Sequence, residues 1–166
     1  MKTLPAFTLL ETLVAVSVLL MALLGPFSIA QQSLRSSYYA RDQVTAFYLA
    51  QEGVEFVRAV RDENYLSGSD WLAGIGAACT GTPCTVDYPN FTYAACPQGG
   101  CPVLKVSANG ALYNHDSGTD SPFTRHVLLT ASPTNPDQII VSVTISWKSA
   151  GVSRVFTIQE RLFNWL

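Results

Sequence analysis

Charge is scarce in this chain. Asp, Glu, Lys and Arg make up only 13% of the 166 residues, and the net charge at pH 7 is −2. The ten Lys and Arg residues are scattered, so no basic patch or stripe indicates a nucleic-acid partner. Hydrophobic residues reach 48%, which is high for a soluble protein, and the length leaves room for one domain.

Histidine is also scarce, and motifs that carry catalysis are missing. His115 lies in a polar stretch and His126 opens an apolar one, but neither belongs to a nucleophile motif. Gly74-Ile-Gly76 lacks the strand-to-helix setting of a phosphate loop. Asp116 and Asp120 lack the spacing of an EF-hand calcium loop. We therefore expect no enzyme activity, no cofactor and no metal site.

The cysteines predict export and disulfide bonds. Cys79, Cys84, Cys96 and Cys101 lie within 23 residues, and an even count behind an apolar N-terminus indicates an oxidising compartment. Four cysteines allow three connectivities, of which the local one, Cys79 with Cys84 and Cys96 with Cys101, is the simplest. A zinc site made by all four thiolates is the alternative. Zinc modules favour shorter C-x2-C spacings, so we expect disulfides that staple a loop-rich region.

Apolar residues are plentiful, and they are concentrated near the N-terminus. The 24 residues from Phe7 to Ala30 contain a single ionisable side chain, Glu11. About 20 apolar residues are enough for a helix to cross a bilayer. Lys2 precedes this run and Arg35 follows it, so the flanking charges do not set its orientation.

Two ordinary interpretations of the apolar run conflict with Glu11. The run could be a secretory signal peptide, because Ser28-Ile29-Ala30 is similar to a cleavage site and cutting after Ala30 would release a disulfide-bonded binding module. It could also be a simple transmembrane anchor. A carboxylate in hydrocarbon costs roughly 2.5 to 3.5 kcal/mol and is retained when a partner compensates for it. Both interpretations leave Glu11 without such a partner.

A third interpretation supplies the partner. The string Ala6-Phe7-Thr8-Leu9-Leu10-Glu11 resembles the processing site of type IV prepilins and type II secretion pseudopilins. The resemblance implies that residues 1–6 are a leader peptide, that a prepilin peptidase cuts between Ala6 and Phe7, and that the new amine of Phe7 is methylated. Glu11 falls on the fifth mature position, where the family has Glu. The family usually has Gly before the cut, where this chain has the similarly small Ala6.

The physical chemistry of this arrangement explains a retained carboxylate. Cleavage before Phe7 places a positive amine at the end of an apolar helix. In a filament core, the Glu11 carboxylate of one subunit can neutralise the amine of its neighbour. We therefore expect Glu11 to act in assembly, with residues 7–30 serving first as a transmembrane segment and then as the filament core.

Helical periodicity continues over residues 31–64. Apolar side chains recur there largely at steps of three and four, with charged residues between them, which predicts the amphipathic second half of one helix. A helix from Phe7 to Asn64 would be about 85 Å long. The apolar positions are Leu34, Tyr38, Val44, Phe47, Tyr48, Val54, Val57 and Val60.

Three local features of this helix carry separate expectations. Gly25 and Pro26 predict a helix break in the form of a kink or loosened turn, because Pro removes a backbone hydrogen bond. Gly53 is either a site of close packing or a tolerated glycine. The charges of the second half, Glu52 among them, are expected on a solvated helix face.

Residues 65–166 predict a globular β head. The stretch 103–107, Asn109-Gly110 and 111–113 reads as a hairpin. Two strands are expected at 124–131 and 138–147, and another at 152–163. From Ile139 to Trp147 the odd-numbered residues are apolar, so they should face a core. About four antiparallel strands covered by the amphipathic helix make an α+β fold, which is the pilin architecture that the resemblance implies.

The resemblance implies a structural role. The chain is expected to be a minor pilin of a type IV pilus, with a type II secretion pseudopilin and the secreted binding module as alternatives. Its partners would be other pilin subunits, the prepilin peptidase and methylase, the inner-membrane assembly platform and membrane lipid, with no nucleic acid. It would cross the cytoplasmic membrane once with the head outside and become extracellular in the filament.

Overall fold

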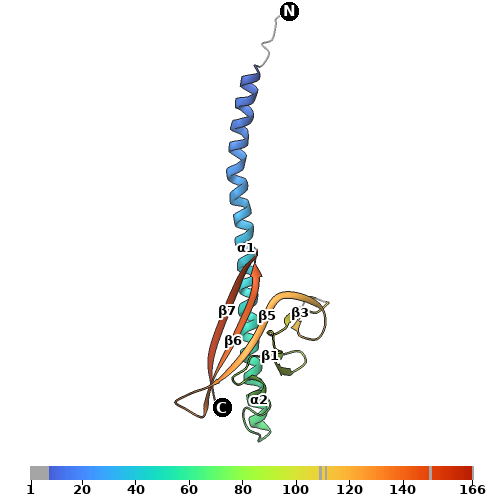
Figure 1. Cartoon of the computed structure of the whole chain (residues 1–166), viewed down its shortest axis with the longest axis vertical. Helices are drawn as coiled ribbons and strands as arrows, with labels where there is room; N and C mark the ends of the chain where they lie inside the picture. Colours follow the sequence, from blue (N-terminus) through green and yellow to red (C-terminus); the bar gives the residue numbers. More distant parts are fainter. Residues whose placement is uncertain (1–7, 109, 111, 150, 166) are drawn as a thin grey trace, which may run out of the picture. The chain divides into compact units, whose positions relative to one another are not determined.

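A computed structural model describes residues 8–108, 110, 112–149 and 151–165. The chain divides into two compact units, Met1–Ala40 and Arg41–Leu166, and helix α1 (Leu9–Leu66) contributes to both (Figure 1). The second unit contains the short helix α2 (Ile75–Cys79) and the strands of one antiparallel sheet, and we call it the head. The fold is therefore α+β, with a long N-terminal helix and a C-terminal antiparallel sheet.

The first unit is helical from Leu9 to its end at Ala40. Thr8 precedes the helix, and its Oγ1 accepts a hydrogen bond of 3.3 Å from the backbone amide of Glu11, which satisfies one of the free donors of the first turn. The helical assignment continues through Gly25 and Pro26, so the helix does not end there. A kink within the continuous helix stays a prediction.

Three long strands form the main part of the sheet. They are β5 (Thr119–Ala131), β6 (Gln138–Ser149) and β7 (Val152–Phe163). Strand β6 pairs with β5 from Ile139 to Ser146 and with β7 along its whole length. The predicted strands at 124–131, 138–147 and 152–163 are confirmed, with β5 and β6 longer than expected.

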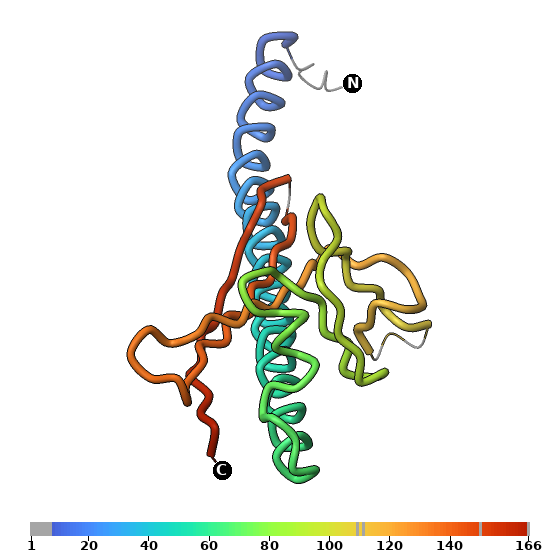
Figure 2. The backbone as a smooth tube through the Cα atoms, turned by 60° about the horizontal axis from the view of Figure 1, so that its bottom comes forward, coloured from blue at the N-terminus to red at the C-terminus, as the bar shows by residue number. Residues whose placement is uncertain are grey.

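Alternation along β6 places its apolar face inward as predicted. The five odd-numbered residues from Ile139 to Trp147 are buried, and the even-numbered residues between them are partly exposed. The stretch of α1 beyond Arg41 covers this face, and Figures 1 and 2 show β6 and β7 running along it. The packing produces one core between helix and sheet, as the α+β prediction requires.

Four short strands complete the sheet, and the antiparallel pairing of 103–106 with 113–114 confirms the predicted hairpin. The described residues form seven strands in all. Of the short ones, β1 (Cys84–Asp87) pairs with β2 (Thr92–Ala95), and β3 (Val103–Val106) pairs with β4 (Tyr113–Asn114). Strands β1 and β3 both pair with β5. The cysteine region, expected as irregular, thus contains two strands and α2. These elements have only two to five residues, too few to produce a visible period.

The buried face of α1 differs from the predicted stripe. Val54, Val57 and Val60 are buried as expected, but Val44, Phe47 and Tyr48 are exposed. The residues that complete the buried face are Ala46, Leu49, Ala50, Gly53 and Phe56. Several of these are small, and small side chains let the helix backbone approach the sheet closely. The stripe predicted from hydrophobicity is therefore rotated about the helix axis relative to the face of α1 that packs on the sheet.

Gly53 is the point of closest approach, which decides between its two predicted roles. A Cβ built on Gly53 would lie 2.8 Å from Val143 Cγ1 and 3.3 Å from Val143 Cγ2. Both atoms belong to a stiff β-branched side chain in the centre of β6. Close packing, and not mere tolerance, therefore explains this glycine.

Gly53→Ala should lower the free energy of unfolding of the head by about 1 to 2 kcal/mol, because overpacking outweighs the gain in helix propensity. Urea unfolding of the full chain in detergent, followed by tryptophan fluorescence, measures this. In a Val143→Ala background the same change should be neutral or stabilising, because the contact is gone. An equal loss in both backgrounds would contradict the packing explanation.

Candidate functional site

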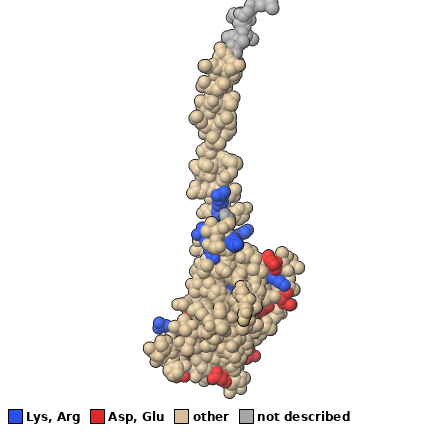
Figure 3. Space-filling view, in the orientation of Figure 1, with Lys and Arg blue, Asp and Glu red and all other residues tan. Residues whose placement is uncertain are grey.

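The large apolar side chains in the described part of the apolar run are exposed. From Leu9 to Ile29 the large apolar side chains are 53 to 80% exposed, and they point to all sides of α1. Mean hydropathy of the best 18-residue window is 2.4, with none of that window buried. On the face seen in Figure 3, this stretch has no Lys, Arg, Asp or Glu. A helix that is apolar all round requires lipid or other protein around it.

Glu11 is the one ionisable side chain in this stretch. It lies in the first turn of α1, where the positive end of the helix dipole favours a carboxylate. Among the described residues, none donates a hydrogen bond to its carboxylate or forms an ion pair with it. The predicted cleavage position, Ala6 and Phe7, lies outside the described residues. The structure thus leaves Glu11 available for a cation from outside the described chain.

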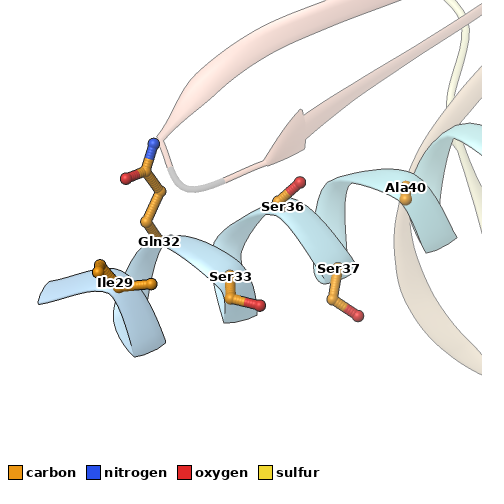
Figure 4. Close-up of a pocket in the computed structure, with 6 residues that line it drawn as sticks. All are labelled: Ile29, Gln32, Ser33, Ser36, Ser37 and Ala40. Carbon is orange, nitrogen blue, oxygen red and sulfur yellow. The ribbon is translucent and has the colours of Figure 1, made fainter. Parts of the chain in front are cut away.

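A shallow hollow follows the apolar stretch on the same unit. Figure 4 shows its lining side chains along one stretch of α1, and all are small or uncharged. They are Ile29, Gln32, Ser33, Ser36, Ser37 and Ala40. The hollow is open along the helix surface, so it lacks the walls that a small-molecule site needs.

The cysteines form the two local disulfides that the simplest connectivity predicts. Cys79 and Cys84 join the end of α2 to the start of β1, and both are fully buried. Cys96 and Cys101 close the loop between β2 and β3, with a Cα–Cα distance of 4.8 Å. All four cysteines are paired, which leaves no thiolate for the alternative zinc site. Within the described residues, no group of three His, Cys, Asp or Glu is placed to hold a metal ion.

A buried arginine that the sequence did not single out connects three elements of the head. Arg125 on β5 has no exposed surface. Its Nη1 donates to the carbonyl of Leu49 at 3.1 Å and to Glu52 Oε1 at 2.9 Å, both on α1. Its Nη2 donates to the carbonyl of Val86 on β1 at 2.8 Å. Glu52, expected on a solvated face, is therefore the counter-ion of a core arginine.

A second polar pair lies next to this arginine. Asp87, almost fully buried on β1, accepts a 3.0 Å hydrogen bond from the backbone amide of His115. Burial lowers the pKa of His115, and the positive charge of Arg125 lowers it further. His115 is therefore neutral at pH 7. Within the described structure, neither ring nitrogen has a hydrogen-bond partner, and neither does Asp87 Oδ1.

The remaining polar candidates do not assemble into a catalytic constellation. Burial lowers the pKa of His126 as well, but its side chain lies beside the Cys96–Cys101 loop, on the face of β5 opposite that of Arg125. Asp116 and Asp120 are exposed, and Lys105 Nζ donates to the backbone carbonyl of Asp116 at 3.0 Å. Gly74 precedes α2 with a positive φ of 76°, and the Tyr93 hydroxyl occupies the place where its side chain would begin.

Comparison of the chain with protein-family models, with curated proteins and with solved structures finds no match. The class of protein is therefore inferred from the organisation of the chain itself. A long apolar N-terminal helix is consistent with a membrane anchor, and two disulfides are consistent with a head in an extracellular, oxidising compartment.

Proposed function

We propose that this chain is a structural subunit of a type IV pilus or related filament, of the minor pilin kind. It is made with a six-residue leader, processed between Ala6 and Phe7, and assembled through the apolar part of α1. The observation that carries the proposal is Glu11, a carboxylate without a partner among the described residues, near the start of the helical stretch from Leu9 to Ile29, whose large apolar side chains are exposed.

Two chemical requirements support a filament over a simple anchor. A lone carboxylate in an apolar medium needs a cation, and the amine created before Phe7 is a cation at the adjoining helix end. Because one helix presents both charges near the same end, a neighbouring copy can satisfy each of them. The apolar surface around them is then buried between subunits instead of in lipid.

The two disulfide bonds of the head support the same proposal. Local disulfides on α2, β1 and the loop after β2 restrain a region built from very short strands. Such bonds persist outside the cytoplasm, where the head of an inserted subunit and of an assembled filament would lie. A secretion pseudopilin would share all these features, and the cellular machine that assembles the chain distinguishes it from a pilus subunit.

The N-terminus of the mature protein tests the proposal. Mass spectrometry of the chain isolated from a strain with a prepilin peptidase should find N-methylated Phe7 as the first residue. Ala6→Gly is the matched variant, and it should be cut at least as completely, because Gly is the family's usual residue before the cut. A mature chain that begins at Gln31 would instead support the secreted binding module, and a chain that keeps residues 1–6 would support a plain anchor.

A further inference from the structure

The two disulfides of the head close loops of equal size but differ in their surroundings. Five positions separate the cysteines of each pair, so the chain entropy of closing the loop is the same for both. Cys79 and Cys84 have no exposed surface. Cys96 and Cys101 are only partly buried, and both line a surface hollow of about 380 Å³. The second bond is therefore the one that a reactant in solution can approach in the folded head.

The hollow lies where two short strands join β5. Strand β1 pairs with β5 at Val127, and the pairing of β3 with β5 begins where Val103 lies opposite Thr124. His126 lies on β5 between these two places, and its side chain lines the hollow. Because β3 and β5 are antiparallel, the same register continued by two residues carries Cys101 towards His126. The fold thus brings an imidazole and a disulfide to one hollow.

The described residues that line the hollow are uncharged at pH 7. Burial lowers the pKa of His126, so its imidazole is neutral and can accept a proton. On β6, the residue opposite His126 is Thr144, which does not titrate. A neutral imidazole at this place suits a thiol that enters the hollow and must lose its proton to become a nucleophile. Besides the disulfide and His126, the lining residues are Thr82, Pro83, Pro97, Gln98 and Gly100.

The loop closed by Cys96 and Cys101 lies outside the core of the head. Residues 97–100 are all exposed, and they lead from β2 to β3. Strand β2 is at the edge of the described sheet, next to β1 alone. The backbone amide of Cys96 donates to the Pro83 carbonyl at 2.9 Å, so β2 stays attached to the chain before β1 without help from the bond. Opening the bond should therefore free the loop and leave the core intact.

We propose that the Cys96–Cys101 disulfide is a reversible thiol-exchange site, which a dithiol reduces in the folded head with His126 as the proton carrier. His126 takes the proton of an incoming thiol, and the thiolate attacks the sulfur of one cysteine. The sulfur of the other cysteine leaves as a thiolate and takes the proton from the imidazolium. The second thiol of the reactant repeats the step and displaces the first cysteine. Two electrons and two protons pass to the protein, and the reactant becomes a disulfide.

This site goes beyond the proposed function, because it uses only residues of the head and requires neither cleavage nor assembly. It gives the head two states, with the loop from β2 to β3 either closed or open. A pair of thiols is the chemistry that the site recognises. Both a low-mass dithiol and a thioredoxin-like protein offer such a pair.

Differential alkylation tests the site on the full chain in detergent. The chain is treated with increasing concentrations of dithiothreitol, quenched with iodoacetamide and analysed by mass spectrometry of its peptides. Cys96 and Cys101 should be alkylated at a dithiothreitol concentration at least about tenfold lower than Cys79 and Cys84 require. The fluorescence of Trp71 and Trp147 should stay that of the folded head while only the first pair reacts.

The Cys79–Cys84 bond is the matched internal control, because it closes a loop of the same size in the same molecule. Equal reactivity of the two bonds would overturn the proposal, because exposure would then give no preference. Reaction of Cys79 and Cys84 first would overturn it as well. So would reaction of Cys96 and Cys101 only at concentrations that also change the tryptophan fluorescence, because the bond would then open only in an unfolding head.

A trapping experiment separates the two sources of the dithiol. A thioredoxin-like protein whose second active-site cysteine is changed to alanine cannot complete the exchange, so it stays bound as a mixed disulfide. Its capture on Cys96 or Cys101 would support the site with a protein as its partner. Reduction by dithiothreitol without such capture would support the site with a low-mass partner. Capture on Cys79 or Cys84 would contradict the proposal.

The pH dependence of the reduction rate tests the part played by His126. Below the thiol pKa, unassisted exchange slows by about tenfold for each unit that the pH falls, because only the thiolate attacks. The unchanged chain should slow less steeply, because the neutral imidazole supplies thiolate inside the hollow. His126→Gln should follow the unassisted slope, and His115→Gln, the matched variant outside the hollow, should keep the slope of the unchanged chain. Equal slopes for His126→Gln and the unchanged chain would refute the proton transfer.

Discussion

Arg125→Ala is expected to lower the free energy of unfolding of the head by about 3 to 5 kcal/mol. The substitution would leave the buried carbonyls of Leu49 and Val86 without their donor and would open a cavity in the core. Loss of its partner costs less at Glu52, because the Glu52 side chain is 31% exposed and water can solvate its carboxylate. Urea unfolding of the full chain in detergent, followed by the fluorescence of Trp71 and Trp147, measures the loss.

Two further variants separate the hydrogen-bond network from charge alone. Arg125→Lys keeps the positive charge, but one ammonium group cannot reproduce the fork that reaches both α1 and β1. We expect it to recover only part of the stability. Arg161→Ala removes an exposed arginine from β7 and should change stability by no more than about 0.5 kcal/mol. Equal losses for Arg125→Ala and Arg161→Ala would show that the buried contacts contribute nothing.

Under the proposed function, Glu11→Ala is expected to reduce incorporation into filaments by at least about tenfold while leaving insertion into the membrane intact. Without the carboxylate, the amine of a neighbouring Phe7 would be buried unpaired, which costs several kcal/mol for each subunit contact. Insertion should not suffer, because removing a charge makes the segment more apolar. Immunoblots of sheared filaments and of washed membranes measure the two quantities separately.

Glu11→Gln is the matched variant, because it keeps the shape of the side chain and loses only its charge. It should behave like Glu11→Ala if ion pairing is what matters. Ser17→Ala, in the same apolar stretch, should assemble normally, since the Ser17 hydroxyl donates only to the Leu13 carbonyl of its own helix. Incorporation of the Glu11→Gln variant into filaments at the level of the unchanged chain would contradict the assembly role of this carboxylate.

Features with a strong local period were the ones that could be predicted from the sequence. The alternation from Ile139 to Trp147 identified the core face of β6, because successive side chains of a strand point to opposite sides. The local disulfides could also be predicted, since the cysteines of each pair lie only five positions apart. The candidate site at Glu11 stood out for a similar reason, as one carboxylate in 24 otherwise non-ionisable residues.

Features that depend on distant residues were missed. Strands β1 and β2 were not predicted, because four residues are too few to show a repeat, and their place in the sheet depends on the pairing of β1 with β5. Arg125 appears in the sequence as one arginine among several. Its burial depends on Glu52, Leu49 and Val86, which are 39 to 76 residues away along the chain.

The sequence by itself determined the apolar segment, the place of Glu11 within it, the long strands of the sheet and the chemistry of the cysteines. Each of these depends on side chains that are close together along the chain. Tertiary structure alone decided which face of α1 is buried, because Gly53 and its small neighbours fit against Val143 while the larger Phe47 and Tyr48 do not enter the core. It also gave the buried Arg125 its partners on α1 and β1.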